Sequence, residues 1–90
     1  MPTTDAFEAI AHVTRRRLLR LLAGGEKPAG ELASYFDESR PAVSRHLRVL
    51  RDAGLVSVRG DAQRRVYRLE PGPLREVEGF IVDLGRGARV

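Results

Sequence analysis

The stretch Ser39–Val56, SRPAVSRHLRVLRDAGLV, constrains the fold more than any other part of the sequence. Its apolar residues Val43, Leu47 and Leu50 recur at spacings of four and three, which predicts one buried ridge along a helix. A serine suited to capping and a proline suited to the first turn precede the ridge, and a glycine follows it. We therefore predict a helix over residues 40–53 with one face packed into a core.

The opposite face of this helix is basic, and residues 40–51 contain no acidic side chain. A solvated helix usually mixes charges four residues apart to gain ion pairs, so this face favours a polyanionic partner. The segment 40–68 contains eight arginines and two acidic residues, a net charge of +6, whereas the whole chain has a net charge of +4. Such a localised basic surface points to a phosphate-rich partner or an anionic membrane, with a simple solvated helix as the alternative.

The surrounding pattern predicts a mainly α fold with a small β-hairpin (α+β), in one domain over residues 1–90. The predicted elements are helices at about 4–12, from Thr14 to the Gly24-Gly25 pair, at 29–36 and at 40–53, then strands 55–59 and 65–69, then a helix at about 73–85. A short helix, a turn and a longer helix with a polar outer face form a helix-turn-helix pattern at 29–53. The hairpin at 55–69 makes it a winged helix-turn-helix.

Outward positions on the 40–53 helix and at the hairpin tip are the candidate DNA-binding residues. They are Ser39, Arg40, Ser44, Arg45, His46, Arg48, Arg51, Gln63, Arg64 and Arg65. Arginine can donate two hydrogen bonds to a guanine edge, and serine can bond bases or phosphates. A helix of groove width with such side chains favours double-stranded DNA over RNA or membrane, and His46 is as well suited to packing as to a phosphate contact.

Pro41 to Val56, together with three shorter strings, resembles the ArsR family of bacterial winged-helix repressors. The other matching strings are Thr14–Leu22, Glu31–Ala33 and Arg64–Leu69, and the resemblance covers roughly residues 5 to 82. It implies a transcriptional repressor that is a homodimer held by its first and last helices and that binds a palindromic operator.

The last helix has apolar residues at a 3-4-3 spacing, which suits packing against another helix. This seam and two residues of the first helix form the predicted dimer interface: Phe7, Ile10, Leu74, Val77, Phe80, Ile81 and Leu84. A chain of 90 residues builds only a small core, which also favours an oligomer.

Differences between this sequence and the family pattern bear on whether the protein responds to a metal ion or another effector. Metal-sensing members have cysteines in the third helix or Asp/His and His/Glu sets in the last, whereas this chain has no cysteine and no histidine after His46. His12-Val13 replaces the family's Asp-Pro before Thr-Arg. We therefore predict no cofactor, no metal site and no effector that the sequence identifies, with a metal- or ligand-responsive repressor of the same fold as the alternative.

Other function classes fit poorly. The sequence lacks nucleophile-elbow, zincin, P-loop and paired-acid motifs, and Ser44 and His46 diverge by about 200° on one helix, so an enzyme is not expected. No apolar run approaches the ~20 residues of a membrane span, the start does not resemble a signal peptide, and the lack of cysteine fits a cytoplasmic protein. A winged-helix module for protein–protein interaction remains open, although the acid-free face argues against it.

Overall fold

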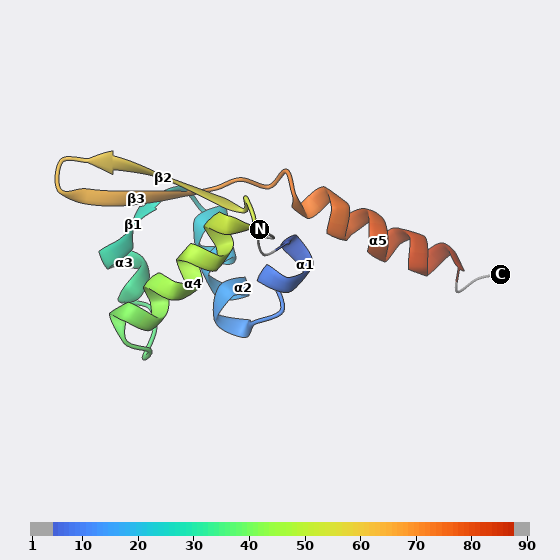
Figure 1. Cartoon of the computed structure of the whole chain (residues 1–90), viewed down its shortest axis with the longest axis horizontal. Coiled ribbons are helices and arrows are strands. Elements are labelled where there is room, and N and C mark those ends of the chain that lie inside the picture. Colours follow the sequence, from blue (N-terminus) through green and yellow to red (C-terminus); the bar gives the residue numbers. More distant parts are fainter. Residues whose placement is uncertain (1–4, 88–90) are drawn as a thin grey trace.

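A bundle of short helices lies between a β-hairpin and a long C-terminal helix that project in opposite directions (Figure 1). The computed structural model describes residues 5–87. Its elements are α1 Ala6–Ala9, α2 Val13–Ala23, β1 Lys27–Pro28, α3 Ala29–Ala33, α4 Arg40–Asp52, β2 Val56–Asp61, β3 Arg64–Leu69 and α5 Leu74–Gly87. The predicted mainly α fold with a hairpin wing is confirmed, and the short strand β1 is an addition.

The first two helices begin at side-chain caps. The Asp5 carboxylate accepts from the Glu8 N–H at 2.9 Å and starts α1, and His12 Nδ1 accepts from the Thr14 N–H at 3.1 Å and starts α2. Helix α1 ends at Ala9, earlier than the predicted limit of residue 12, because the backbone of His12 is extended in its capping role. Residue 4, the predicted start of the first helix, lies outside the described residues.

Helix α3 is also shorter than the predicted 29–36. The amides of Ser34, Tyr35 and Phe36 bond carbonyls three residues back, at 3.1–3.2 Å, so the chain tightens into turns after Ala33. The Ser34 hydroxyl donates to the Glu31 carbonyl at 2.6 Å and occupies an acceptor that a longer helix would use.

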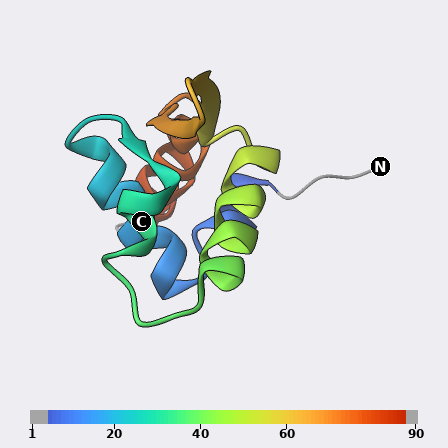
Figure 2. The ribbon, with the colours of Figure 1, turned by 90° about the vertical axis from the view of Figure 1, so that its left-hand side faces the viewer.

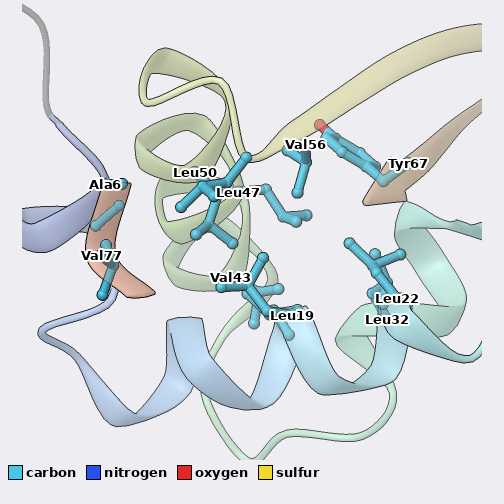
Figure 3. Packing of buried hydrophobic residues seen from close by; sticks show 13 residues of the cluster. Ala6, Leu19, Leu22, Leu32, Val43, Leu47, Leu50, Val56, Tyr67 and Val77 are labelled. Carbon is cyan, nitrogen blue, oxygen red and sulfur yellow. The ribbon is translucent and has the colours of Figure 1, made fainter. Parts of the chain in front are cut away.

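The core lies between α2, α3, α4 and the inner part of the sheet, as Figure 3 shows. The largest fully buried side chains are Leu18, Leu32, Val43, Leu47, Leu50 and Leu55. Burying a leucine or valine side chain contributes about 1.5–3 kcal/mol to the free energy of folding. Val43, Leu47 and Leu50 therefore hold the inner face of α4 against the core. The predicted ridge of Val43, Leu47 and Leu50 is confirmed.

The sheet has the strand order β1-β3-β2 and is antiparallel throughout. Strands β2 and β3 pair from Val56↔Leu69 to Asp61↔Arg64, so only Ala62 and Gln63 remain in the turn, whereas the predicted strands left residues 60–64 between them. Strand β1 pairs only with the inner part of β3, at Tyr67 and Val66. It was missed because two residues, one of them proline, show no strand periodicity.

Helix α5 runs to Gly87, beyond the predicted end at 85, and projects away from the rest of the chain (Figure 1). It contacts the body mainly through α1, where the rings of Phe7 and Phe80 pack edge to face with centroids 5.4 Å apart. No helix within residues 5–87 is long and apolar enough to cross a lipid bilayer.

Candidate nucleic-acid interface

Helix α4 presents a polar face because both of its ends and its inner face are fixed. The Ser39 hydroxyl accepts from the Ala42 N–H at 3.2 Å, Pro41 lies in the first turn, and Gly54 follows with φ 77. A φ in this range favours glycine, which explains why the helix stops here. With the ridge of Val43, Leu47 and Leu50 buried, the arginines of α4 lie on its outer side.

The outward side chains of α4 are mostly the predicted ones. Arg40, Ser44, Arg45, Arg48 and Arg51 are all exposed. Among residues 5–87, none of these four arginines is within 4.0 Å of a carboxylate, so their charges are uncompensated. Ser39 is exposed too, although its hydroxyl is engaged as the helix cap.

The wing tip adds a second group of polar side chains. Gln63, Arg64 and Arg65 are exposed at the turn of the hairpin. Arg64 donates to the Asp61 carboxylate at 2.7 Å, and this hydrogen bond lowers the pKa of Asp61. Arg65 is in no ion pair within the described part of the chain. The guanidinium of Arg64 is therefore partly engaged by an acid, whereas that of Arg65 is available to an external anion.

Helix α4 and the wing border common depressions. Arg40 of α4 and Arg64 and Arg65 of the wing line one, together with the start of α3. Ser44, Arg48, Arg51, Arg65 and Tyr67 line the other. Figure 2 shows α4 and the hairpin on the same side of the molecule. We call these exposed polar side chains of α4 and the wing tip the basic face: Arg40, Ser44, Arg45, Arg48, Arg51, Gln63, Arg64 and Arg65.

His46 lies apart from the basic face and is packed against α2, so its part in DNA binding stays a prediction from the sequence. Its side chain is only 15% exposed, and its Nε2 atom is 3.2 Å from a Glu38 oxygen. Its Nδ1 atom is 3.3 Å from the Arg15 guanidinium, and its ring packs against His12 at 4.3 Å between centroids. The reason is position, since residue 46 borders the buried ridge at Leu47 and faces α2. Its packing alternative agrees with the structure.

Several other arginines counted in the basic segment are paired with acids. Arg59 bonds Glu26, which follows α2, and Arg68 is 3.9 Å from Glu70. The hydrogen bond with Glu26 raises the pKa of Arg59. Counting charges within residues 40–68 could not find these pairs, because Glu26 and Glu70 both lie outside that segment. They reduce the free charge of the wing strands and leave it concentrated on α4 and the wing tip.

The predicted dimer seam is divided between the core and the surface. Val77 is buried beside Ala6 in the chain's own core (Figure 3), so it is not available to a partner, while Leu74, Phe7 and Ile10 are half-buried. Phe80, Ile81 and Leu84 are 51%, 61% and 58% exposed. Val82, which the 3-4-3 spacing did not include, is 44% exposed. We call Phe80, Ile81 and Leu84 the apolar face of α5.

Possible metal ligands do not gather in the described chain. Within residues 5–87, no group of three histidine, cysteine or acidic side chains is placed to hold a metal ion. The rings of the two histidines are adjacent, but Nδ1 of His12 contacts a backbone amide, and the two ring nitrogens of His46 contact a guanidinium and a carboxylate.

The architecture described above, a helix-turn-helix followed by a hairpin wing, is that of a winged-helix DNA-binding protein. Residues 12–58 match the bacterial regulatory protein arsR family. The chain belongs to this family of transcriptional regulators, which agrees with the resemblance inferred from the sequence and with the expectation that it is not an enzyme.

Three relatives illustrate the match. The HTH-type transcriptional regulator Rv2034 of Mycobacterium tuberculosis is 50% identical over 66 residues, which cover 73% of this chain and 62% of the relative. The transcriptional repressor SdpR of Bacillus subtilis is 38% identical over 72 residues, 80% of each chain. A crystal structure of a possible transcriptional regulator for arsenical resistance superposes with a TM-score of 0.82 and 45% identity, covering 89% of this chain and 83% of that one. The match thus spans less than two thirds of the mycobacterial regulator.

Proposed function

We propose that this protein is a homodimeric transcriptional repressor that acts in the cytoplasm by binding a palindromic operator with two copies of α4. The observation that carries the proposal is the basic face, where the four arginines of α4 have no acidic partner among the described residues. Placing like charges on one helix is unfavourable unless a polyanion neutralises them. The name of the Bacillus subtilis relative supports repression over other modes of regulation.

In this proposal α4 lies in the major groove and its N-terminal half contacts bases. Ser44 and Arg45 are the proposed base contacts, because both are exposed in the first half of α4. Arg40, Arg48 and Arg51 neutralise phosphates along the groove. Ser39 fixes the start of the helix, and Gln63, Arg64 and Arg65 of the wing contact the flanking backbone or minor groove.

Dimerisation is proposed through α5 and α1. The apolar face of α5 has no cover within residues 5–87, and Phe7 extends it through its contact with Phe80. A second copy can cover the same face by two-fold symmetry, which also explains a palindromic site. The two α4 helices would then lie about 34 Å apart, one turn of DNA.

No effector is proposed. A metal-independent mode of action is supported by the donor chemistry, because the chain has no cysteine and the described residues bring no three ligands together. Transition metals in proteins favour thiolate and imidazole ligands. A ligand of another class remains the alternative within the same fold.

Selection of bound fragments from genomic DNA tests the proposal. The expected result is a consensus with dyad symmetry, bound by a species of twice the chain mass in light scattering. Affinity should fall steeply with salt, with a log–log slope of about −0.9 for each phosphate contacted. If no DNA is enriched and the salt slope is near zero, the basic face has another partner, and a protein–protein interaction module becomes the better description.

A further inference from the structure

A cluster of polar side chains joins α4 to the start of α2. It comprises His12 and Arg15 of the α2 start, Glu38 before α4, His46 of α4, and Thr14. The Thr14 hydroxyl donates to Glu38 at 2.5 Å, and Thr14 is only 5% exposed. The proposed function uses none of these residues to contact DNA, so the purpose of the cluster is open.

The contacts of His46 require a neutral ring. Its Nδ1 atom is 3.3 Å from an Arg15 guanidinium nitrogen, and a guanidinium can only donate hydrogen bonds. Nδ1 must therefore accept, and the ring proton lies on Nε2, which donates to Glu38 at 3.2 Å. Protonating the ring would place an N–H at Nδ1, opposite the N–H of Arg15, and this contact would be lost.

His12 has the same requirement for a different reason. Its Nδ1 atom accepts from the backbone N–H of Thr14 at 3.1 Å and so caps α2. A protonated ring has no acceptor to offer there, and the cap would be lost. The two imidazole rings are 4.3 Å apart at their centroids, so two protonated rings would also repel each other. Both histidines are therefore placed to be neutral.

Arg15 connects this pair to the rest of the chain. It donates from Nε to the Ala9 carbonyl at 2.6 Å and from a terminal nitrogen to the Glu8 carbonyl at 3.3 Å. One side chain of α2 thus holds the end of α1 and the ring on α4 together. Residue 46 directly follows Arg45, a proposed base contact. A shift of the His46 ring would therefore also move Arg45, which lies in the same helical turn.

We propose that the His12–His46 pair is a positioning device that seats α4 against α1 and α2 only while both rings are neutral, so that acidification unseats α4 and weakens recognition of the operator. This inference rests on the proposed DNA-binding function for its second half only. We call the contacts of the neutral His12 and His46 rings with Thr14, Arg15 and Glu38 the clasp. The clasp is a property of the protein without DNA.

The charged groups around His46 favour a neutral ring, as the proposal requires. Burial lowers the pKa of His46, and His12 and Arg15 lower it further, whereas Glu38 opposes them. The hydrogen bond from Thr14 holds the pKa of Glu38 below its usual range, so Glu38 remains a carboxylate while His46 takes up a proton. From α1, the cluster receives only the Glu8 and Ala9 carbonyls, through Arg15. Because the folded-state pKa of His46 is lowered, its stabilising effect is complete above about pH 6.5 and is lost as the pH falls below that value.

Simple electrostatics predicts the opposite pH effect on DNA binding. Protonated histidines add positive charge, which strengthens binding to any DNA. The clasp predicts weaker binding to the operator at low pH, while binding to unrelated DNA holds or strengthens. The ratio of the two affinities therefore separates the proposal from a general charge effect.

The chain offers a matched variant that keeps the contacts without the titration. In His12→Asn the side-chain oxygen can still cap α2, because asparagine is among the best N-caps. In His46→Gln the amide can still donate to Glu38, and neither amide titrates. These are the only two histidines in the sequence, so the double variant H12N/H46Q removes every imidazole.

The first experiment measures thermal unfolding without DNA at fixed protein concentration from pH 8 to pH 5.5. The melting temperature of the natural chain should fall by roughly 5 °C or more, and that of H12N/H46Q by clearly less. In parallel, NMR of the imidazole nitrogens at pH 8 should show the proton of His46 on Nε2. A proton on Nδ1, or a ring that titrates at or above about pH 6.5, would overturn the clasp.

The second experiment uses the selected operator fragment and a scrambled fragment of the same length. Between pH 7.5 and pH 5.5 the affinity ratio should fall about tenfold for the natural chain, which is the factor given by one pKa unit of coupling. It should stay constant for H12N/H46Q. An equal fall in both proteins would overturn the link to recognition. If no operator can be selected, the proposed function fails, while the melting and NMR results still decide the clasp.

Discussion

The two ends of the molecule expose opposite kinds of side chain. At one end of its 54 Å long axis the wing and α4 present arginines, and at the other α5 presents Phe80, Ile81 and Leu84. The basic end rests on a well-packed core beneath α4, whereas α5 contacts little beyond α1. Each surface is unfavourable in an isolated chain, because the arginines repel one another without counter-charges and the apolar side chains are exposed to water. The comparison indicates that the proposed DNA binding and the proposed self-association use separate surfaces, so that each end can be tested without disturbing the other.

The largest expected effect comes from breaking the apolar end. We predict that Ile81→Asp gives a monomer and weakens operator binding by about 100-fold or more, because one recognition helix no longer benefits from the effective concentration of the second. Light scattering and a gel-shift titration measure both properties. Arg86→Ala is the control, since it changes the net charge equally on the other side of α5. A dimeric Ile81→Asp would mean that copies associate elsewhere.

A smaller, sequence-dependent effect is expected at α4. Arg45→Ala should cost about 1–3 kcal/mol on the selected operator and should relax the preference at one base pair, because a base contact is lost. Ser44→Ala should act in the same direction. Binding of both variants to unrelated DNA should change little, and Arg86→Ala again serves as the control. If Arg45→Ala binds its operator unchanged, the face of α4 that contacts bases has been misassigned.

The wing should give a weaker effect that is uniform across sequences. Arg65→Ala is expected to reduce the log–log salt slope by about 0.9, the value for one phosphate contact. Arg64→Ala should reduce it less, because its guanidinium already bonds the Asp61 carboxylate. Asp61→Asn should release Arg64 and strengthen binding slightly. Titrations at four salt concentrations distinguish these cases, and equal slopes for all three variants would contradict the assignment.

The smallest effect concerns the turn of the wing. Ala62 has φ 57, a conformation that costs a residue with a side chain more than it costs glycine, so Ala62→Gly should raise the free energy of unfolding by about 0.5–1 kcal/mol. Gly60 lies in strand β2 with open space beside it, so the reverse exchange Gly60→Ala should stabilise as well. Urea unfolding measures both. A destabilised Ala62→Gly would show that the alanine side chain has a role in the turn.

Much of the fold could be predicted because its signals are local. Helix α4 was predicted at 40–53 and lies at Arg40–Asp52. The prediction succeeded because the capping serine, the apolar periodicity and the terminal glycine all lie within or next to the helix itself. Strand β1 could not be found, because pairing with β3 alone defines it. The burial of Val77 and His46 could not be predicted for a related reason: a spacing pattern shows that a residue lies near a helix face, but not which neighbour covers it.

The register of the sheet has a consequence for the wing. Strand β1 pairs with β3 at Val66 and Tyr67, so residues 60–65 form a two-stranded ribbon held only by their own hydrogen bonds. This tip is therefore an exchangeable part: it can be lengthened, shortened or replaced by a loop from another relative without repacking the helix-turn-helix. If the wing contacts flanking DNA as proposed, grafting different tips onto this chain would give a set of regulators that share one core half-site and differ in the flanking DNA they prefer.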